Sequence, residues 1–342
     1  MHSNIDKNLT ILAIESSCDE TACAVVKNGR EVLSDIVASQ IEIHRRFGGV
    51  VPEVASRNHV LAIESVVREA IEKARISPKD IDAVAVTYGA GLLGALLVGV
   101  SFAKGLAYAW DKPLYAVSHI KGHLAANYIE SDLTPQYICL LASGGHTAVL
   151  KVEDYDKIQS LGSTRDDAAG EAFDKVARVL GLPYPGGPQI ENLAKQGAPL
   201  IKFPAPAFKN DDMLYLSFSG LKTAVVNYVN SAKQKGEKVN AADVACSFQK
   251  AAVTQLFDTA MRAAKLTGLK TVAISGGVSA NSLLRGMFDA AAKDRGLKIY
   301  YPKIKYCTDN AAMIASAAYF SIISGAPASD LSLDAKATVE LK

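Results

Sequence analysis

Two histidines four residues apart have a spacing that suggests a shared ligand. On a helix, His119 and His123 would lie on one face with their Cβ atoms about 5–6 Å apart, close enough to share a metal. Histidine is a common ligand of zinc and iron. The chain holds only six histidines, and two of them fall at this spacing. We therefore favour a metal site over a chance pair of surface or core histidines.

A metal held by two histidines needs a further ligand, and a carboxylate is expected. Asp309 lies in Thr308-Asp309-Asn310, directly before a predicted helix, and is the candidate acid. It could instead cap that helix, which is a common role of aspartate, and the sequence does not decide between the two roles. The zincin motif H-E-x-x-H is absent, because Ile120 stands where its glutamate would be.

Three glycine turns predict a nucleotide site. Ser143-Gly144-Gly145 and Ser275-Gly276-Gly277 each follow an apolar strand, and Pro185-Gly186-Gly187 follows a helix. Glycine lets the backbone approach a phosphate closely, so that successive N–H groups or a helix N-terminus bind the anion. One such turn is more often a tight connection, but three together favour nucleotide binding. No P-loop or Rossmann glycine fingerprint follows a strand.

Acidic residues are concentrated in the segment Asp166–Lys175. Asp167, Glu171 and Asp174 are spaced i, i+4 and i+7, so a helix through them would carry all three on one face. Asp166 and Asp167 would suit the positive end of that helix. Asp174 lies deeper, where we expect it to accept hydrogen bonds from a ribose or to hold Mg²⁺ through water.

The composition is that of a globular protein with little bulk attraction for nucleic acid. Hydrophobic residues make up 49% of the 342, and 37 Lys+Arg against 35 Asp+Glu leave a net charge of +2. One small basic region contains His44-Arg45-Arg46-Phe47 and Arg57-Asn58-His59. It could touch a phosphate backbone, but such a region is more often a solvated face.

The predicted elements alternate between strand and helix, which indicates an α/β protein, and the length suits two lobes. Two hairpins of the same design, 11–26 and 138–152, suggest a duplicated architecture. Further strands are expected at 81–87, 114–117 and 271–275. Helices are expected at 59–74, 91–108, 120–128, 168–180, 242–266, 279–292 and 311–323, the last packed back on the first lobe.

Cysteine usage and apolar runs bear on the compartment. Five widely spaced cysteines without a C-x-x-C pair argue against a disulfide framework and for a reducing compartment. The first ten residues carry no apolar signal-peptide core. The uncharged stretch Thr87–Ala103 contains four glycines and is shorter than the roughly 20 residues of a membrane span, so we expect a buried helix there.

Nine segments together closely resemble one family, the universal tRNA N6-adenosine threonylcarbamoyltransferases, called TsaD in bacteria. They occur in family order between about Ile11 and Ala317, which is nearly the whole chain. The segments are Glu15–Thr21, Gly48–Glu53, His119-x-x-x-His123, Ser143–Thr147, Asp166–Lys175, Tyr184–Gly187, Phe218–Lys222, Ser275–Asn281 and Thr308-Asp309-Asn310.

The resemblance implies an α/β fold of two lobes from the actin-like, Hsp70-like (ASKHA, RNase H-like) superfamily, with a nucleotide cleft between them. Residues 1–130 plus 308–342 would form the lobe that carries the metal-binding histidines. Residues 131–307 would form the lobe that carries the nucleotide-binding loops.

The resemblance also implies roles for individual residues. His119, His123 and Asp309 would bind one divalent metal per subunit, Fe²⁺ or Zn²⁺, and a Mg²⁺ ion could accompany the nucleotide. No clear general base is evident, and His146 is the residue considered for that role. The nucleotide part of the substrate would be held by Leu141, Ala142, Ser143, Gly144, Gly145, Asp174, Gly187 and Asn281, with Glu191 where other members have aspartate or serine.

Members of the family transfer the threonylcarbamoyl group of threonylcarbamoyl-AMP to N6 of the adenosine next to the anticodon, position 37, in tRNAs that read ANN codons, forming t6A. AMP is a good leaving group, so positioning and charge stabilisation should dominate. The expected partners are tRNA, threonylcarbamoyl-AMP and ATP or AMP. Bacterial members work with an inactive paralogue and a small ATPase, others with a kinase and small accessory subunits. We expect a cytoplasmic enzyme without a membrane partner.

Three alternatives stay open. A metallopeptidase is one, because the family has carried an O-sialoglycoprotein endopeptidase label, although the missing glutamate counts against it. An ATP-regulated scaffold or a small-molecule kinase on the same superfamily fold is another. The third is the inactive paralogue, which lacks the metal pair, so that His119, His123 and Asp309 argue against it.

Overall fold

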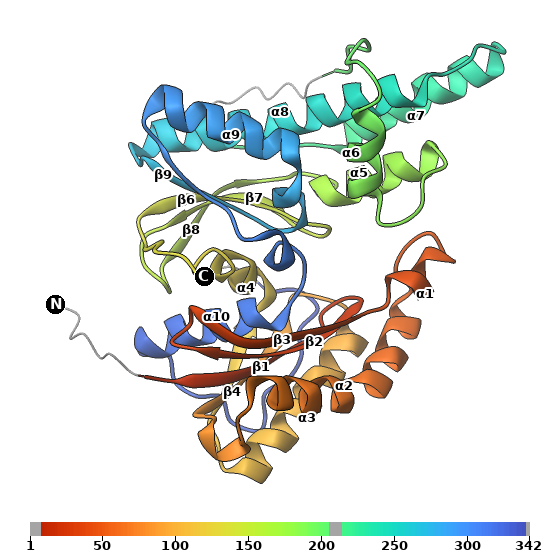
Figure 1. The fold of residues 1–342 in the computed structure, drawn as a ribbon. Helices are drawn as coiled ribbons and strands as arrows, with labels where there is room; N and C mark the ends of the chain where they lie inside the picture. The colour runs from red at the N-terminus through yellow and green to blue at the C-terminus, as the bar shows by residue number, and fades with distance from the viewer. Residues whose placement is uncertain (1–7, 205–213, 340–342) are drawn as a thin grey trace. The chain divides into compact units, whose positions relative to one another are not determined.

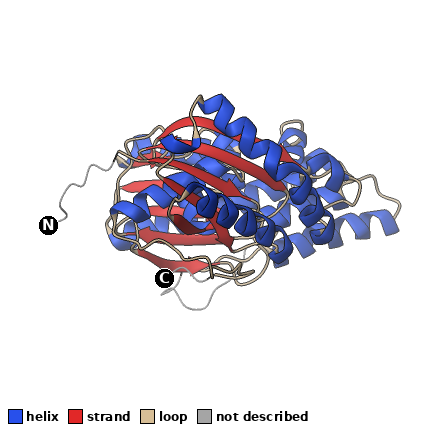
Figure 2. Cartoon of the chain, turned by 90° about the horizontal axis from the view of Figure 1, so that it is seen from below, coloured by secondary structure: helices blue, strands red, loops and turns tan. Residues whose placement is uncertain are grey.

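The computed structural model describes residues 8–204 and 214–339, which divide into two compact units. Unit 1 contains residues 8–135, 154–157 and 302–339, and unit 2 contains the described residues of 136–153 and 158–301. Each unit is built on one five-stranded sheet with helices packed against it (Figures 1 and 2). The chain is therefore a mixed α/β protein with two sheets.

Unit 1 contains the sheet with strand order β3-β2-β1-β4-β5. Its strands β1, β2 and β3 pair antiparallel, whereas β1, β4 and β5 pair parallel. Five of the six residues of β1 are buried, as expected for a central strand whose two faces are both covered. The strands are β1 (Thr10–Glu15), β2 (Glu20–Lys27), β3 (Glu31–Ser39), β4 (Ala83–Gly89) and β5 (Leu114–Ser118).

Helices cover both faces of this sheet (Figure 1). On one face lie α2 (Pro52–Ala74) and α3 (Leu93–Trp110), and on the other lies α10 (Ala311–Ile323), with α4 (His119–Ala125) packed against it. The sequence prediction that the last helix packs on the first sheet is confirmed, because α10 contacts all five strands. Short helices α1 (Ile41–Arg45), η1 (Pro78–Asp80) and η3 (Ile304–Tyr306) complete unit 1.

Unit 2 contains the sheet with strand order β10-β9-β6-β7-β8. Strands β6, β7 and β8 pair antiparallel, whereas β6, β9 and β10 pair parallel. This is the strand order and direction of the first sheet, with β6–β10 in the places of β1–β5. The duplication suggested by the two hairpins is therefore present in the sheet topology. The strands are β6 (Tyr137–Ala142), β7 (Thr147–Val152), β8 (Ile158–Ser163), β9 (Thr271–Ser275) and β10 (Lys298–Tyr300).

The long helix α8 forms the centre of the helical layer of unit 2. It packs against β6, β7 and β9, and its Phe248 lies edge-on to Phe173 in the core. Asn240 caps its first turn by accepting the amide of Ala242, and Gly268 ends it in the left-handed conformation. The helices of this unit are α5 (Ala169–Val179), α6 (Gly186–Ala194), α7 (Ser219–Gln234), α8 (Ala241–Thr267), α9 (Ser282–Arg295) and the short η2 (Gly277–Ala280).

Helix α3 is the one helix in the described chain that is long and apolar enough, by length and composition, to cross a membrane. A single such helix is weak evidence, since core helices pass the same test. The sequence predicted a buried helix here, but only 33% of the apolar window is buried. Helix α3 packs on α2 and β4, and its side chains Leu93, Leu97 and Tyr108 are exposed.

Candidate functional site

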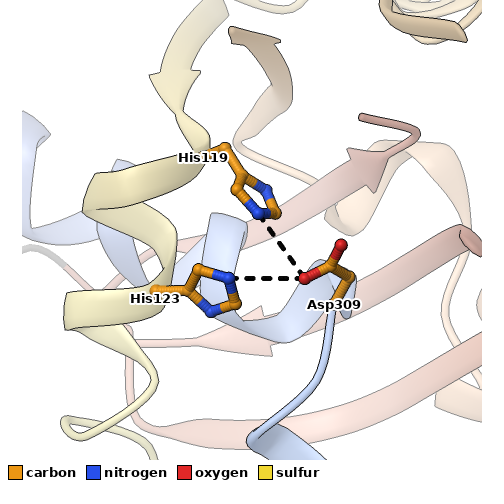
Figure 3. Close-up of side chains that lie close together, drawn as sticks. All are labelled: His119, His123 and Asp309. Carbon is orange, nitrogen blue, oxygen red and sulfur yellow. Dashed lines mark ion pairs between the residues drawn. The ribbon is translucent and has the colours of Figure 1, made fainter. Parts of the chain in front are cut away.

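The three side chains predicted to bind a metal come together in unit 1 (Figure 3). His119 and His123 lie one turn apart on α4, and Asp309 lies on the segment directly before α10. The Oδ1 atom of Asp309 is 3.5 Å from Nε2 of His119 and 3.3 Å from Nε2 of His123. One ligand atom from each residue lies within 4.8 Å of the other two.

The local fold explains how these residues meet. Strand β5 ends at Ser118 and α4 begins at the next residue, so both histidines lie at the carboxyl end of a parallel strand, where sites form in α/β sheets. The alternative role of Asp309 as a helix cap is filled by its neighbour: the side chain of Asn310 accepts the amide of Met313 in α10. The carboxylate of Asp309 points instead toward the histidines.

This donor set fits a divalent transition metal. Two imidazole nitrogens and a carboxylate oxygen are ligands typical of catalytic zinc and non-haem iron sites. Both ring nitrogens of His123 are buried, and neither makes a hydrogen bond among the described residues, although Nε2 lies 3.3 Å from Oδ1 of Asp309. A buried polar atom without a partner costs free energy, and a cation bound at Nε2 would remove that cost for one of them.

Glu15, which the sequence analysis did not single out, lies behind His119. Its Oε2 atom is 3.2 Å from Nδ1 of His119 and accepts a hydrogen bond of 2.6 Å from the Thr87 hydroxyl. Its Oε1 atom accepts the amide of Ser17 at 2.5 Å, and the Ser17 hydroxyl lies 3.1 Å from the same histidine nitrogen. The only sequence signal for Glu15 was its place in the family segment Glu15–Thr21.

Burial and charge act in opposite directions on this histidine–carboxylate pair. Desolvation alone would lower the pKa of His119, but the carboxylates of Asp309 and Glu15 outweigh it and raise that pKa to about 9 in the metal-free protein. Burial likewise works to raise the pKa of Glu15, but the charge of His119 and its hydrogen bond hold that pKa below its usual value. His119 thus lies between two carboxylates, which both favour its protonated form when no metal is bound.

The three predicted glycine turns all lie in unit 2. The first connects β6 to β7, the second opens α6, and the third follows β9. In the first turn, the amide of His146 donates to Oγ of Ser143 at 3.1 Å, and its carbonyl accepts the amide of Ser143 at 2.8 Å. These contacts place His146, the residue considered as a general base, at the end of the β6–β7 turn.

Some glycines of these turns are required by packing. A Cβ atom on Gly276, whose φ is +85°, would lie 2.4 Å from the carbonyl oxygen of Ala142. A Cβ atom on Gly186 would lie 2.7 Å from Cα of Asp174 and 2.6 Å from Cβ of Ala177. These two positions exclude a side chain for reasons internal to the protein.

Other glycines of the same turns have no such internal reason. A Cβ atom would meet no atom of the described residues within 4 Å, and φ lies outside the left-handed region. The free space beside their backbone suits the close approach of a ligand. These glycines are Gly144, Gly145, Gly187 and Gly277.

The polar residues predicted to contact the nucleotide are also tied to the protein. One oxygen of Asp174 on α5 accepts the amide of Gly186 at 2.6 Å, which fixes the start of α6. Glu191 links α6 to α9 by accepting the hydroxyl and amide of Ser282 at 2.5 and 3.2 Å. Asn281 caps α9 and donates to Gln249 at 2.9 Å. Leu141 and Ala142 are buried at the end of β6.

The acidic segment differs from its prediction. Because α5 begins at Ala169, Asp166 and Asp167 lie before the helix, and Asp167 does not share a helical face with Asp174. Asp166 instead accepts the first amides of α7, and Asp167 forms ion pairs with two lysines. The carboxylates stabilise the positive end of a different helix because β8 ends beside the start of α7.

The predicted basic region is smaller than the sequence suggested. His44 and His59 are fully buried rather than on a solvated face. His59 bonds to the Thr21 hydroxyl at 2.7 Å and to the Cys18 carbonyl oxygen at 2.9 Å, which ties α2 to the turn between β1 and β2. The arginines at 45 and 57 pair with glutamates of their own helices.

Fold and site together define a class of protein. It is an α/β protein of two units with one sheet topology, in which one unit carries a His-His-Asp cluster that could hold a metal and the other carries glycines that face free space. The model of the TsaD family, described as tRNA N6-adenosine threonylcarbamoyltransferase, matches residues 31–316. The chain belongs to this family.

Individual relatives agree with the family match. A Clostridium perfringens tRNA N6-adenosine threonylcarbamoyltransferase is 58% identical over 339 residues, which cover 98% of this chain and 99% of the relative. The protein of the same name from Clostridium kluyveri is 54% identical with the same coverage. Among solved structures, HypF from T. kodakarensis is similar in fold alone, with a TM-score of 0.64 and 18% identity over 94% of this chain and 48% of that chain.

Proposed function

We propose that this chain transfers the threonylcarbamoyl group of threonylcarbamoyl-AMP to N6 of adenosine 37 in tRNAs that read ANN codons, forming t6A. The observation that carries the proposal is the His119–His123–Asp309 cluster in a chain that is 58% identical, over 339 residues, to a relative named for this activity. A metallopeptidase is not favoured, because the relatives of this chain are named as transferases and Ile120 stands where the zincin motif has glutamate.

In this reaction, positioning of the substrates should contribute more to catalysis than a covalent intermediate with the protein. The exocyclic amine attacks the carbamoyl carbon, the bond from that carbon to the phosphate oxygen of AMP breaks, and the amine loses a proton. A divalent metal bound by His119, His123 and Asp309 would supply Lewis acidity toward the threonyl and carbamoyl oxygens. The adenine can be splayed out of a single-stranded loop at modest cost.

In this proposal the residues of unit 2 hold the AMP portion. The amides around Gly144, Gly145 and Gly187 bind the phosphate, since nothing of the described chain fills the space beside them. Asp174, which accepts the amide of Gly186, also contacts the ribose. Asn281 contacts the nucleotide, with Glu191 as a further contact. His146 takes the proton from the amine, and Mg²⁺ accompanies the nucleotide.

We also propose that residues 1–130 plus 308–342 and residues 131–307 are two lobes of the actin-like superfamily. The shared strand order of the two sheets supports this assignment, as does the similarity in fold to HypF. The proposed metal is Fe²⁺ or Zn²⁺, and the proposed location is the cytoplasm.

For partners we propose the bacterial set, an inactive paralogue and a small ATPase, because the relatives are bacterial. A groove of about 610 Å³ between α2 and α3 is the proposed surface for the paralogue. A paralogue with the same fold would present the same helix pair, so the two could pack isologously. The groove is lined by Val60, Ile63, Glu64, Leu97, Val98, Ser101 and Phe102.

A charge in this groove is expected to prevent assembly. Leu97 is 41% exposed, so Leu97→Glu should leave the fold and the metal content unchanged while it reduces binding of the paralogue at least tenfold in calorimetry. Tyr108→Glu on the same helix, 77% exposed and outside the groove lining, is the matched control. Equal binding by wild type and Leu97→Glu would place the partner elsewhere.

Reconstitution tests the transfer itself. The protein and its partner subunits are incubated with threonylcarbamoyl-AMP and unmodified tRNA, and the digested RNA is analysed for t6A by mass spectrometry. Wild type and the exposed variant Tyr108→Ala should form t6A, whereas His119→Ala and His123→Ala should not. Activity in both histidine variants would remove the metal from the mechanism. Absence of t6A with folded, metal-loaded wild type would remove the transferase assignment and call for assays of ATP turnover and glycoprotein cleavage.

A further inference from the structure

We propose that Glu15 is a positioning residue of the metal site: its carboxylate holds the Nδ1–H group of His119, so that Nε2 faces the cation, and Thr87 holds the carboxylate in place. This inference rests on the proposed metal centre and not on the identity of the group transferred.

The two nitrogens of His119 face two different carboxylates. Nδ1 lies 3.2 Å from Oε2 of Glu15, and Nε2 lies 3.5 Å from Oδ1 of Asp309. A neutral imidazole carries its proton on one nitrogen and can ligate a metal only through the other. A carboxylate that accepts the proton of Nδ1 therefore selects the tautomer in which Nε2 is the ligand, and it makes that nitrogen a stronger donor.

The carboxylate of Glu15 is itself fixed by the sheet. Strands β1 and β4 pair parallel, with Ile14 opposite Val86, so that Glu15 and Thr87 follow as neighbours at the ends of the two strands. The hydroxyl of Thr87 and the amide of Ser17 each donate to a different oxygen of Glu15, which sets the orientation of the whole carboxylate. Both Glu15 and Thr87 are fully buried.

Burial of Glu15 is otherwise hard to account for. It ends an apolar strand, Ile11–Ile14, and an ionised carboxylate in such a place is costly unless it is paired. Among the described residues, His119 is the basic side chain that pairs with its carboxylate, at 3.2 Å. The negative charge of Glu15 is therefore best explained by its pairing with His119 and, through the ring, with a bound cation.

The second histidine has no comparable support. Nδ1 of His123 is buried and has no hydrogen-bond partner among the described residues. Of the two histidines, only His119 is therefore oriented by a carboxylate among the described residues. Loss of its contact with Glu15 should lower the affinity for the metal measurably.

Glu15→Gln is the most direct test. Ser17 must donate to the remaining oxygen, so the new amide group would face Thr87 and Nδ1 of His119. An amide donor at Nδ1 favours the opposite tautomer, with the proton on Nε2, where it blocks the metal. We expect the affinity of the protein for Zn²⁺ to fall about 10–100-fold. Thr87→Val keeps the carboxylate but removes one of its donors, and it should cause a smaller loss in the same direction.

Ser16→Ala is the matched control. Ser16 is a fully buried neighbour of Glu15 whose hydroxyl donates to the carbonyl of Ala95. Zn²⁺ affinity is measured by chelator competition on the purified full chain, the ligand field by the visible spectrum of the Co²⁺ form, and folding by the melting temperature of the metal-free protein. Ser16→Ala should match wild type in Zn²⁺ affinity and Co²⁺ spectrum.

The outcomes separate the inference from the proposed function. Weaker Zn²⁺ binding and an altered Co²⁺ spectrum in folded Glu15→Gln support it, and if that variant does not fold, Thr87→Val decides in the same way. Wild-type affinity and spectrum in the variants overturn it, as does a wild-type protein that binds neither ion. A Glu15 effect on Zn²⁺ in a protein that forms no t6A would leave the inference standing and remove only the transferase assignment.

Discussion

At the scale of single residues, neighbouring side chains before α10 have separate tasks. Asp309 contacts both histidines, whereas Asn310 caps the helix. Asp309→Ala should therefore lower the affinity for the metal by more than the roughly 100-fold expected when a residue that only hydrogen-bonds to a ligand is removed. It should change the stability of the helix little. Asn310→Ala should keep the metal but lower the stability by about 1 kcal/mol. Metal per protein after dialysis and urea unfolding measure the two effects, and a reversed pattern would contradict the assignment.

Adjacent glycines at the start of α6 should also respond differently. A Cβ atom on Gly186 would clash with the backbone of α5, so Gly186→Ala should destabilise the protein by about 1–3 kcal/mol. Gly187 has free space beside it, and alanine suits a helix better than glycine, so Gly187→Ala should melt no lower than wild type. Its methyl group would instead occupy the space assigned to the ligand.

The readouts are the melting temperature and the affinity for AMP by calorimetry. We expect Gly187→Ala to weaken AMP binding at least tenfold without a loss of stability. Unchanged AMP affinity in this variant would show that the free space at Gly187 is not part of the nucleotide site.

At the scale of elements, β3 places a partly buried carboxylate against the start of α10. Burial raises the pKa of Asp35 from 3.8 to about 6, although the amides of Ala312 and Ala311 and the charge of Lys305 act to lower it. The folded protein thus holds this proton more tightly than the unfolded chain does. The contribution of Asp35 to stability is full below about pH 4 and is lost as the pH rises to about 6.

Asp35→Asn removes this titration. The variant should be more stable than wild type above pH 6 by up to roughly 3 kcal/mol, and the difference should shrink toward zero near pH 4. Urea unfolding of the metal-free proteins between pH 4 and 8 measures it. A difference that does not change with pH would assign the effect to packing rather than to ionisation.

Elements with a strong apolar pattern could be predicted from the sequence. The strands at 147–152 and 271–275 and the helix at 311–323 occur with the predicted bounds. Helix α2 begins at Pro52 and not at His59, because proline suits the first position of a helix. Strand β3 was missed, since Ser34 and Asp35 interrupt its apolar alternation, and β8 was missed because three of its six residues are exposed.

Site residues were predictable where spacing along one element carries the information. His119 and His123 lie on one helix, so their i, i+4 spacing was visible. Glu15 was not, because its contact to His119 joins β1 to α4 across 104 positions of the chain. The role of Asp309 required knowing that Asn310 is the cap, and that distinction depends on backbone geometry.

At the scale of the whole molecule, all three proposed ligands belong to unit 1, so metal removal should act on that unit. Binding at a metal concentration 100 times the Kd contributes about 2.7 kcal/mol to the folded state. Hydrogen exchange with and without a chelator should show lost protection in α4 and at the start of α10, and unchanged protection in α8 of unit 2. Equal loss in both units would contradict a centre confined to unit 1.

The order of the ligands along the chain has a consequence for biosynthesis. The third ligand, Asp309, follows His123 by 309 − 123 = 186 positions. At roughly 5–20 residues per second, a ribosome needs about 10–40 s to cover that interval. All of unit 2 lies within this interval of the sequence and can fold before α10 has been synthesised. The sheet of unit 1 lacks α10 until then. A nascent chain therefore holds only two of its proposed metal ligands until residue 309 has been added, and full metal loading marks a chain in which all of unit 2 has already been synthesised.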